Sequence, residues 1–166
     1  MKRSNKTHES RSDPDARLLR KGKGIEACLV HLGTLVGGSA SGMVRACRAS
    51  IACGLELSAE VKSALELASH HIKAGQVLAA VRGYDCRSFT LGLRQLGVRA
   101  HPRQRSTHSS IDGRTARTES YESSMKRRFV VEGANSWIKG EGRMRQTKLR
   151  GTKKVDWVDG SLLLSH

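Results

Sequence analysis

Apolar residues in the first half of the chain recur with the period of strands, and they predict a β-hairpin. Residues 25–36 and 43–50 show mixed alternation of apolar and polar positions, and the turn residues GGSASG separate them at 37–42. In the second of these strands, Val44 and Ala46 are expected on one face.

The period then changes to that of a helix. Ser58 is expected to be its N-cap, and the apolar residues that follow recur at helical spacing: Val61, Ala64, Leu65, Ala68 and Ile72. The apolar run QVLAAV at 76–81 next predicts a short buried strand, which ends in the turn residues RGYD.

A second helix and another strand complete the pattern. Asp85 is expected to cap this helix, whose apolar face consists of Phe89, Leu93 and Leu96, and Gly97 fits its C′ position. The residues VRA after it predict another short strand. The order β-β-α-β-α-β favours an α/β fold, with a mixed sheet and helices packed on it.

The remaining segments are polar and basic. Residues 1–24 are predicted to be a loop or extended arm, and 101–121 a long Ser/Thr/Arg-rich loop with almost nothing to bury. A last helix is predicted to start near Glu122. The folded domain is therefore expected to span 25–139, followed by a basic C-terminal segment at 140–166.

Composition narrows the class of partner. Only 37% of the 166 residues are hydrophobic and 4% aromatic, which is little material for a core. Thirty Lys and Arg stand against fifteen Asp and Glu, and the isoelectric point is near 10.5. Such an excess of positive charge indicates a polyanionic partner, DNA or RNA.

Other features bear on location. No run approaches the ~20 apolar residues of a membrane-spanning helix, and no apolar run of a signal peptide follows the basic start MKRSNKTHES. Cys28, Cys47, Cys53 and Cys86 form no CxxC pair, so we expect reduced thiols buried as small apolar side chains. These features predict a cytoplasmic protein without a membrane partner.

The stretch RRFVVEGANSWIK at 127–139 carries a single acid among bases. Arg128 and Glu132 are four residues apart, and Lys139 follows seven residues after Glu132, so all three lie near one stripe of a helix. From spacing alone, an i,i+4 salt bridge on a solvated basic helix is the commoner arrangement. In the other interpretation, the carboxylate holds a divalent metal and the flanking cations hold phosphates.

The pattern of arginine, three residues, glutamate, six residues and lysine resembles the C-terminal signature of bacterial insertion-sequence transposases of the DDE class. Four other stretches resemble the same family in the same order: KTHESRSDPDARLLRKGKGIEACLVHLG, RGYDCRSFTLGLRQLGVRAHPRQ, SSIDGRTAR and GRMRQTKLRG. The resemblance extends from about Lys6 to Trp157.

This resemblance implies a ribonuclease-H-like fold and DNA transposition, in which three acids hold two Mg²⁺ ions that assist phosphodiester cleavage and strand transfer. Glu132 matches the catalytic glutamate, and Arg128 and Lys139 match its companion cations. Six further cations are expected to contact the DNA backbone: Lys126, Arg127, Arg143, Arg145, Lys148 and Arg150.

Two departures from the family pattern limit what this chain is expected to do. Val81 occupies the position of the second aspartate, and the first aspartate lies in a strand that precedes the region matching Lys6. We therefore expect a truncated transposase domain that binds DNA, lacks activity and holds no Mg²⁺ by itself, with Glu132 as its surviving metal-binding acid. Without the first strand, 25–36 is expected to have an open edge. The alternative is a small basic nucleic-acid-binding module of non-enzymatic origin.

Overall fold

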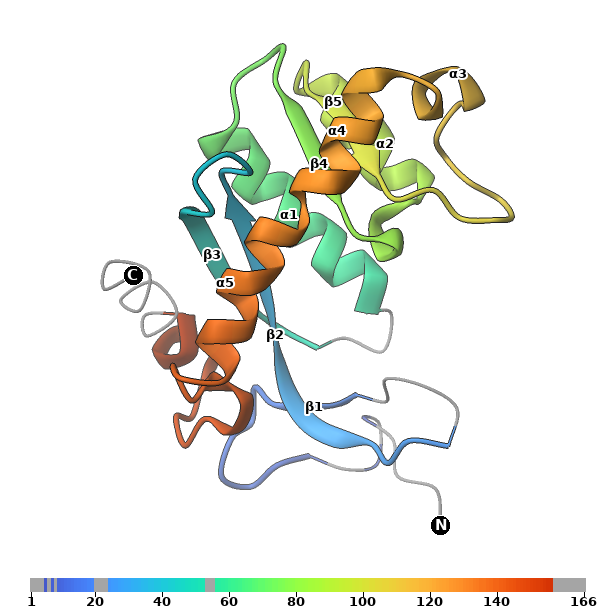
Figure 1. The fold of residues 1–166 in the computed structure, drawn as a ribbon. Coiled ribbons are helices and arrows are strands. Elements are labelled where there is room, and N and C mark those ends of the chain that lie inside the picture. Colours follow the sequence, from blue (N-terminus) through green and yellow to red (C-terminus); the bar gives the residue numbers. More distant parts are fainter. Residues whose placement is uncertain (1–4, 6, 8, 20–23, 53–55, 157–166) are drawn as a thin grey trace.

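The structure is a computed structural model, which describes residues 5, 7, 9–19, 24–52 and 56–156. It has a mixed α/β architecture in which helices cover two groups of strands (Figure 1). The predicted α/β class and the order β-β-α-β-α-β are confirmed for the segment from Cys28 to Pro102.

The predicted hairpin is confirmed. Strand β2 (Cys28–Gly37) pairs antiparallel with β3 (Val44–Ile51), in a register that shifts between Val36 and Gly37. Gly42 adopts a φ of +73°, a backbone conformation that glycine enters without steric cost, so it allows the tight turn between the strands.

An additional strand lies in the segment 1–24, for which a loop or extended arm is predicted. Strand β1 (Arg17–Leu19) pairs antiparallel with Cys28–Val30, whereas His31–Gly37 pair with β3. The loop or extended arm predicted for 1–24 thus contains a short strand that the prediction did not include. An open edge was predicted for the strand at 25–36. Each residue of β2 pairs with one described strand, β1 or β3, so each has one edge without a described partner strand.

Helix α1 (Glu56–His71) has the predicted apolar face, with Val61, Ala64 and Ala68 buried. It begins two residues before Ser58, so Ser58 lies within the first turn and the prediction that it is the N-cap is wrong. The predicted strands on either side of the second helix are also present: β4 (Val77–Ala80) and β5 (Arg99–Pro102), which pair in parallel.

Helix α2 (Arg87–Gln95) follows a short 3₁₀ turn, η1 (Arg82–Tyr84). Its C-cap is Leu96, so Gly97 occupies the C′ position as predicted. The N–H of Gly97 donates to the carbonyl of Arg94 at 3.0 Å, and the N–H of Val98 donates to that of Leu93 at 2.9 Å. This pair of bonds is the Schellman arrangement, and the φ of +69° explains why glycine is at this position.

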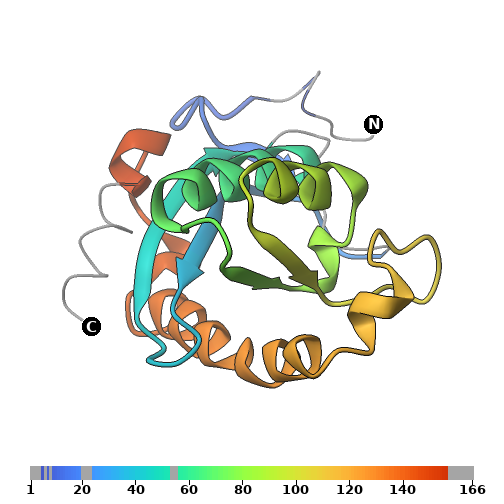
Figure 2. The same ribbon diagram turned by 90° about the horizontal axis from the view of Figure 1, so that it is seen from above.

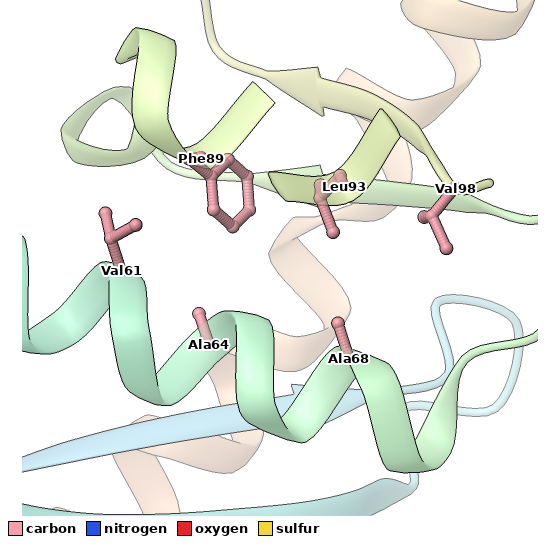
Figure 3. Close-up of a cluster of buried hydrophobic side chains, with 6 residues drawn as sticks. All are labelled: Val61, Ala64, Ala68, Phe89, Leu93 and Val98. Carbon is pink, nitrogen blue, oxygen red and sulfur yellow. The ribbon is translucent and has the colours of Figure 1, made fainter. Parts of the chain in front are cut away.

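Two clusters of buried side chains attach α1 to the hairpin and to the elements around the parallel pair. On one side, α1 packs against α2 and the start of β5, through the residues drawn in Figure 3: Val61, Ala64, Ala68, Phe89, Leu93 and Val98. On another side, Leu67 packs against Val36 of β2 and Ala46 of β3. Helix α1 therefore connects the antiparallel hairpin with the parallel pair.

The segment 101–121 is more ordered than predicted. It contains helix α3 (Gly113–Ala116), and Ile111 is buried. The Tyr121 hydroxyl donates to the carbonyl of Pro102 and accepts from the N–H of Gln104, both at 2.9 Å. The expectation of a loop with almost nothing to bury is therefore wrong.

The helix predicted to start near Glu122 begins three residues earlier and consists of α4 (Glu119–Arg127) and α5 (Phe129–Lys139). Arg128 between them keeps a helical backbone, so the two run nearly continuously. Helix α4 contacts β5 and α5 contacts β2, on the opposite side of the strands from α1 (Figure 2). The strands therefore lie in the middle of three layers.

The basic segment after α5 is connected to the N-terminal arm. It contains a 3₁₀ turn, η2 (Met144–Gln146), and a helical turn at 152–156. Asp13 accepts from the N–H of Gly151 at 3.1 Å, and Asp15 accepts from the N–H of Thr152 at 2.8 Å. These bonds join the two flanking segments to each other. Asp13 also bonds to His31 of β2, and Asp156 accepts from the N–H of Ala49 of β3, so both segments contact the hairpin, which was not predicted.

No helix within the described ranges is long and apolar enough to cross a membrane. Cys28 and Cys86 are free thiols, whereas Cys53 lies outside the described residues. Cys28 is exposed, so the expectation that the cysteines are buried is wrong at this position.

Candidate functional site

Arg128 and Glu132 form the ion pair that their spacing predicts. Nη1 of Arg128 lies 2.6 Å from Oε1 of Glu132, and the side chains are 10% and 44% exposed. The arginine is thus held against the helix while the carboxylate faces solvent. An exposed pair of this kind contributes about 0.3–0.5 kcal/mol to stability, so its main effect is to fix the position of the guanidinium.

A second contact fixes the same guanidinium. Cζ of Arg128 lies 4.3 Å from the centre of the Phe129 ring, which is within the range of a cation–π interaction. Arg128 therefore contacts a carboxylate and an aromatic face at once, at the junction between α4 and α5.

The other predicted members of the site are separated along the fold. Lys139 is exposed at the last residue of α5, where the helix dipole favours a positive charge. Val81 follows β4 in extended backbone conformation and is 43% exposed. Among the three predicted catalytic residues, Arg128 and Glu132 are in direct contact, and Lys139 lies at the far end of the same helix.

The metal that the resemblance implies does not fit the residues at this place. Mg²⁺ prefers several convergent carboxylate oxygens. Glu132 pairs with a cation, and position 81 supplies no oxygen from its side chain. Within the described part of the chain, no group of three or more His, Cys, Asp or Glu side chains could hold a metal ion.

The predicted DNA-binding cations lie at the surface. All six are exposed, and they come from the end of α4 and from the segment around and after η2: Lys126, Arg127, Arg143, Arg145, Lys148 and Arg150. Since η2 packs against α5, this segment is held beside the helix that carries Glu132.

Lys126 has a second role in α4. Its Nζ lies 2.6 Å from Oε1 of Glu122, one turn earlier. The hydrogen bond and the charge of Lys126 hold the pKa of Glu122 below its ordinary value. This acid therefore stays ionised and neutralises part of the positive charge at the end of α4.

The sequence pattern did not indicate that the Asp85 side chain holds the loop after β5 in place. The prediction that it caps α2 is wrong, because Cys86 is the N-cap residue and no side chain caps that end. Asp85 is 1% exposed, and its carboxylate accepts from the N–H groups of Arg105 and Ser110 at 2.6 and 2.8 Å. Burial raises its pKa, but the hydrogen bonds outweigh this effect, so the net pKa lies below the ordinary value.

A buried pair in the N-terminal half was also missed. Nε2 of His31 lies 2.8 Å from Oδ2 of Asp13, and both side chains are nearly covered. Burial raises the pKa of Asp13, whereas bonds from His31 and Gly151 lower it, and the net pKa lies below the ordinary value. The paired acids of SDPDA are the sequence signal that could have indicated this anchor.

A pocket of about 350 Å³ lies between α2, β5 and the loop that Asp85 anchors. Arg94 and Arg99 line it, together with Thr90, Asp112 and Thr115. None of the predicted site residues contributes to its walls, so this pocket is separate from the ion pair on α5.

Comparisons with known proteins leave the family undetermined. No protein-family model matches the chain, and searches of curated proteins and of solved structures found no match either.

Proposed function

We propose that this chain is a DNA-binding domain derived from a DDE-class insertion-sequence transposase, and that it does not cleave or join DNA by itself. The observation that carries the proposal is the excess of exposed cations at both ends of α5, the helix that carries Glu132. From Lys126 to Lys154 there are ten Lys and Arg against two acids, Glu132 and Glu141. Nine of these ten cations are exposed, and the tenth is Arg128, whose charge Glu132 neutralises.

Exposed cations on such a surface suit the DNA backbone. Lysine and arginine side chains contact phosphates without reading bases, and each contact releases a counterion from the DNA. The exposed cations lie at the end of α4, at the last residue of α5 and in the segment that follows. It should therefore give affinity with little sequence preference.

The arrangement of the strands supports the proposed origin. The hairpin and the parallel pair share α1, yet no described strand bonds β2 to β4. In Figure 1, β2 and β4 run in opposite directions, so one strand antiparallel to β2 would also run parallel to β4. The ribonuclease-H-like fold implied by the resemblance has its first strand next to β2.

The proposed loss of activity rests on position 81. In the family pattern this position holds an aspartate at the end of a buried strand, and here Val81 stands at the end of β4. The ribonuclease-H-like reaction uses carboxylates that position two metal ions at the phosphodiester bond. With valine at one of the three positions, the set is incomplete even if the others are supplied.

Charge reversal tests the proposed binding surface. A variant with Arg145→Glu, Lys148→Glu and Arg150→Glu should bind duplex DNA much more weakly than the unmodified chain, measured by fluorescence anisotropy at low salt. Lys62→Glu is the matched control, because Lys62 is an exposed lysine on α1, on the other side of the strands.

Both variants make the surface less positive, so comparing them separates the effect of where the charge lies from the effect of net charge. A loss confined to the triple variant supports the interface. Loss of the same size per charge in Lys62→Glu would show that net charge alone determines binding, and unchanged binding in the triple variant would contradict the proposed surface.

A further inference from the structure

The start of α5 presents exposed apolar side chains directly after the exposed cations Lys126 and Arg127. Phe129 is 55% exposed and Val130 is 44% exposed. Among the described Phe, Tyr and Trp residues, Phe129 is the exposed one. Because the Phe129 ring is exposed, it does not contribute to the core.

The hairpin turn extends this patch. Gly42 is so close to α5 that a Cβ added there would lie 2.9 Å from Cγ1 of Val130. Met43, next in the turn, is 68% exposed. Three apolar side chains from two parts of the chain therefore face solvent together, and we refer to Met43, Phe129 and Val130 as the apolar patch.

Cations surround the apolar patch. Lys126 and Arg127 precede Phe129 on the helix and are exposed, and Arg45 is exposed beside the turn. Arg128 lies over the Phe129 ring and is itself fixed by Glu132, so the ring is held in place from one side. An aromatic ring flanked by cations matches a nucleotide, which has a flat base and a charged phosphate.

From this geometry we propose that Phe129 stacks on an unpaired base of DNA, while Lys126, Arg127 and Arg45 hold the neighbouring phosphates. The inference rests on the proposed DNA binding and adds a preference to it. A base within an intact duplex is stacked on both faces, so the site would favour single-stranded or distorted DNA. Met43 and Val130 would cover the edge of the stacked base.

The test compares two forms of one oligonucleotide that contains 2-aminopurine, a base whose fluorescence falls when it stacks. The unmodified chain should quench the single-stranded form more than the duplex. Phe129→Ala should weaken binding to the single strand by about tenfold and leave duplex binding nearly unchanged. Phe129→Trp should restore the preference, because it keeps an aromatic face.

Leu91→Ala is the control, since Leu91 is 42% exposed on α2 and lies outside the patch. Equal effects of Phe129→Ala on both DNA forms, or an unquenched probe, would overturn the stacking while leaving duplex binding intact. Absence of binding to either form would instead overturn the proposed function. A dimer that Phe129→Ala converts to a monomer, without any change in DNA preference, would assign the patch to a second copy of the chain.

Discussion

Ser110 donates two hydrogen bonds to one oxygen of Asp85: its N–H lies 2.8 Å and its hydroxyl 2.7 Å from Oδ1. This relationship joins a residue between η1 and α2 to the loop that leads into α3. Because Asp85 is buried, each donor that loses its partner would be left without water as a replacement.

Replacing Asp85 should therefore destabilise the fold strongly. Asp85→Ala should lower the free energy of unfolding by about 3 kcal/mol, measured by urea denaturation. Asp112→Ala is the matched control, since Asp112 is an exposed cap that accepts from the N–H of Arg114, and its loss should cost about 1 kcal/mol. Equal losses in both variants would contradict the anchoring role of Asp85.

His101 should make stability depend on pH. It is 3% exposed, and burial together with the charge of Arg99 holds its pKa below the ordinary value of 6.5. The unfolded chain therefore takes up a proton at a higher pH than the folded chain does. The folded state is therefore not penalised by this group above pH 6.5. As the pH falls below 6.5 and through the pKa of the folded state, stability is lost.

The measurement is the free energy of unfolding at several pH values between about 5 and 8. His101→Gln should remove part of the slope, whatever its effect on stability at neutral pH. A slope that is unchanged in the variant would show that His101 does not cause the dependence.

Two helical glycines should respond in opposite ways to alanine. A Cβ at Gly133 of α5 meets nothing within 4 Å, so Gly133→Ala should stabilise the chain by about 0.5–1 kcal/mol. A Cβ at Gly92 of α2 would lie 2.6 Å from Cδ1 of Leu65, so Gly92→Ala should destabilise it by about 1–3 kcal/mol. Thermal unfolding of both variants checks this, and the same sign for both would contradict the packing of α1 on α2.

Cleavage assays test the proposed inactivity. The unmodified chain should not nick or join DNA with Mg²⁺ or Mn²⁺, and Val81→Asp should not suffice, because another carboxylate is still required. Fusion of a strand carrying that aspartate to the Val81→Asp variant should give metal-dependent cleavage. Glu132→Gln in the fusion should abolish it, whereas Lys139→Ala should reduce it less.

One result would contradict the role proposed for Glu132, and another would contradict the role proposed for position 81. Metal-dependent cleavage by the unmodified chain that survives Glu132→Ala would show that another residue acts. A folded, DNA-binding fusion that stays inert would contradict the assignment of Val81 to the lost aspartate.

The elements that could be predicted from sequence are those whose apolar residues repeat at a regular period. The hairpin, α1, α2 and the Gly97 terminus all carry such local signals. Strand β1 and the order in 101–121 could not be predicted, because they depend on partners far along the chain. Leu18 pairs with Leu29, and Ser110 bonds to Asp85, contacts that no local pattern contains.

The candidate site divides in the same way. Spacing predicted the contact between Arg128 and Glu132, which depends on one helical turn. It could not indicate that Phe129 would be exposed, because a phenylalanine on an amphipathic helix is usually buried. In the structure Phe129 is 55% exposed, although the hairpin turn at Gly42 approaches its neighbour Val130.

The most direct test of the central claim is the salt dependence of duplex binding by the unmodified chain. The logarithm of the association constant should fall linearly with the logarithm of the salt concentration, with a slope of about −0.9 for each phosphate contacted. The triple variant Arg145→Glu, Lys148→Glu and Arg150→Glu should have a shallower slope, and Lys62→Glu should match the unmodified chain. A flat response to salt, or no binding at low salt, would contradict the claim that this basic surface binds DNA.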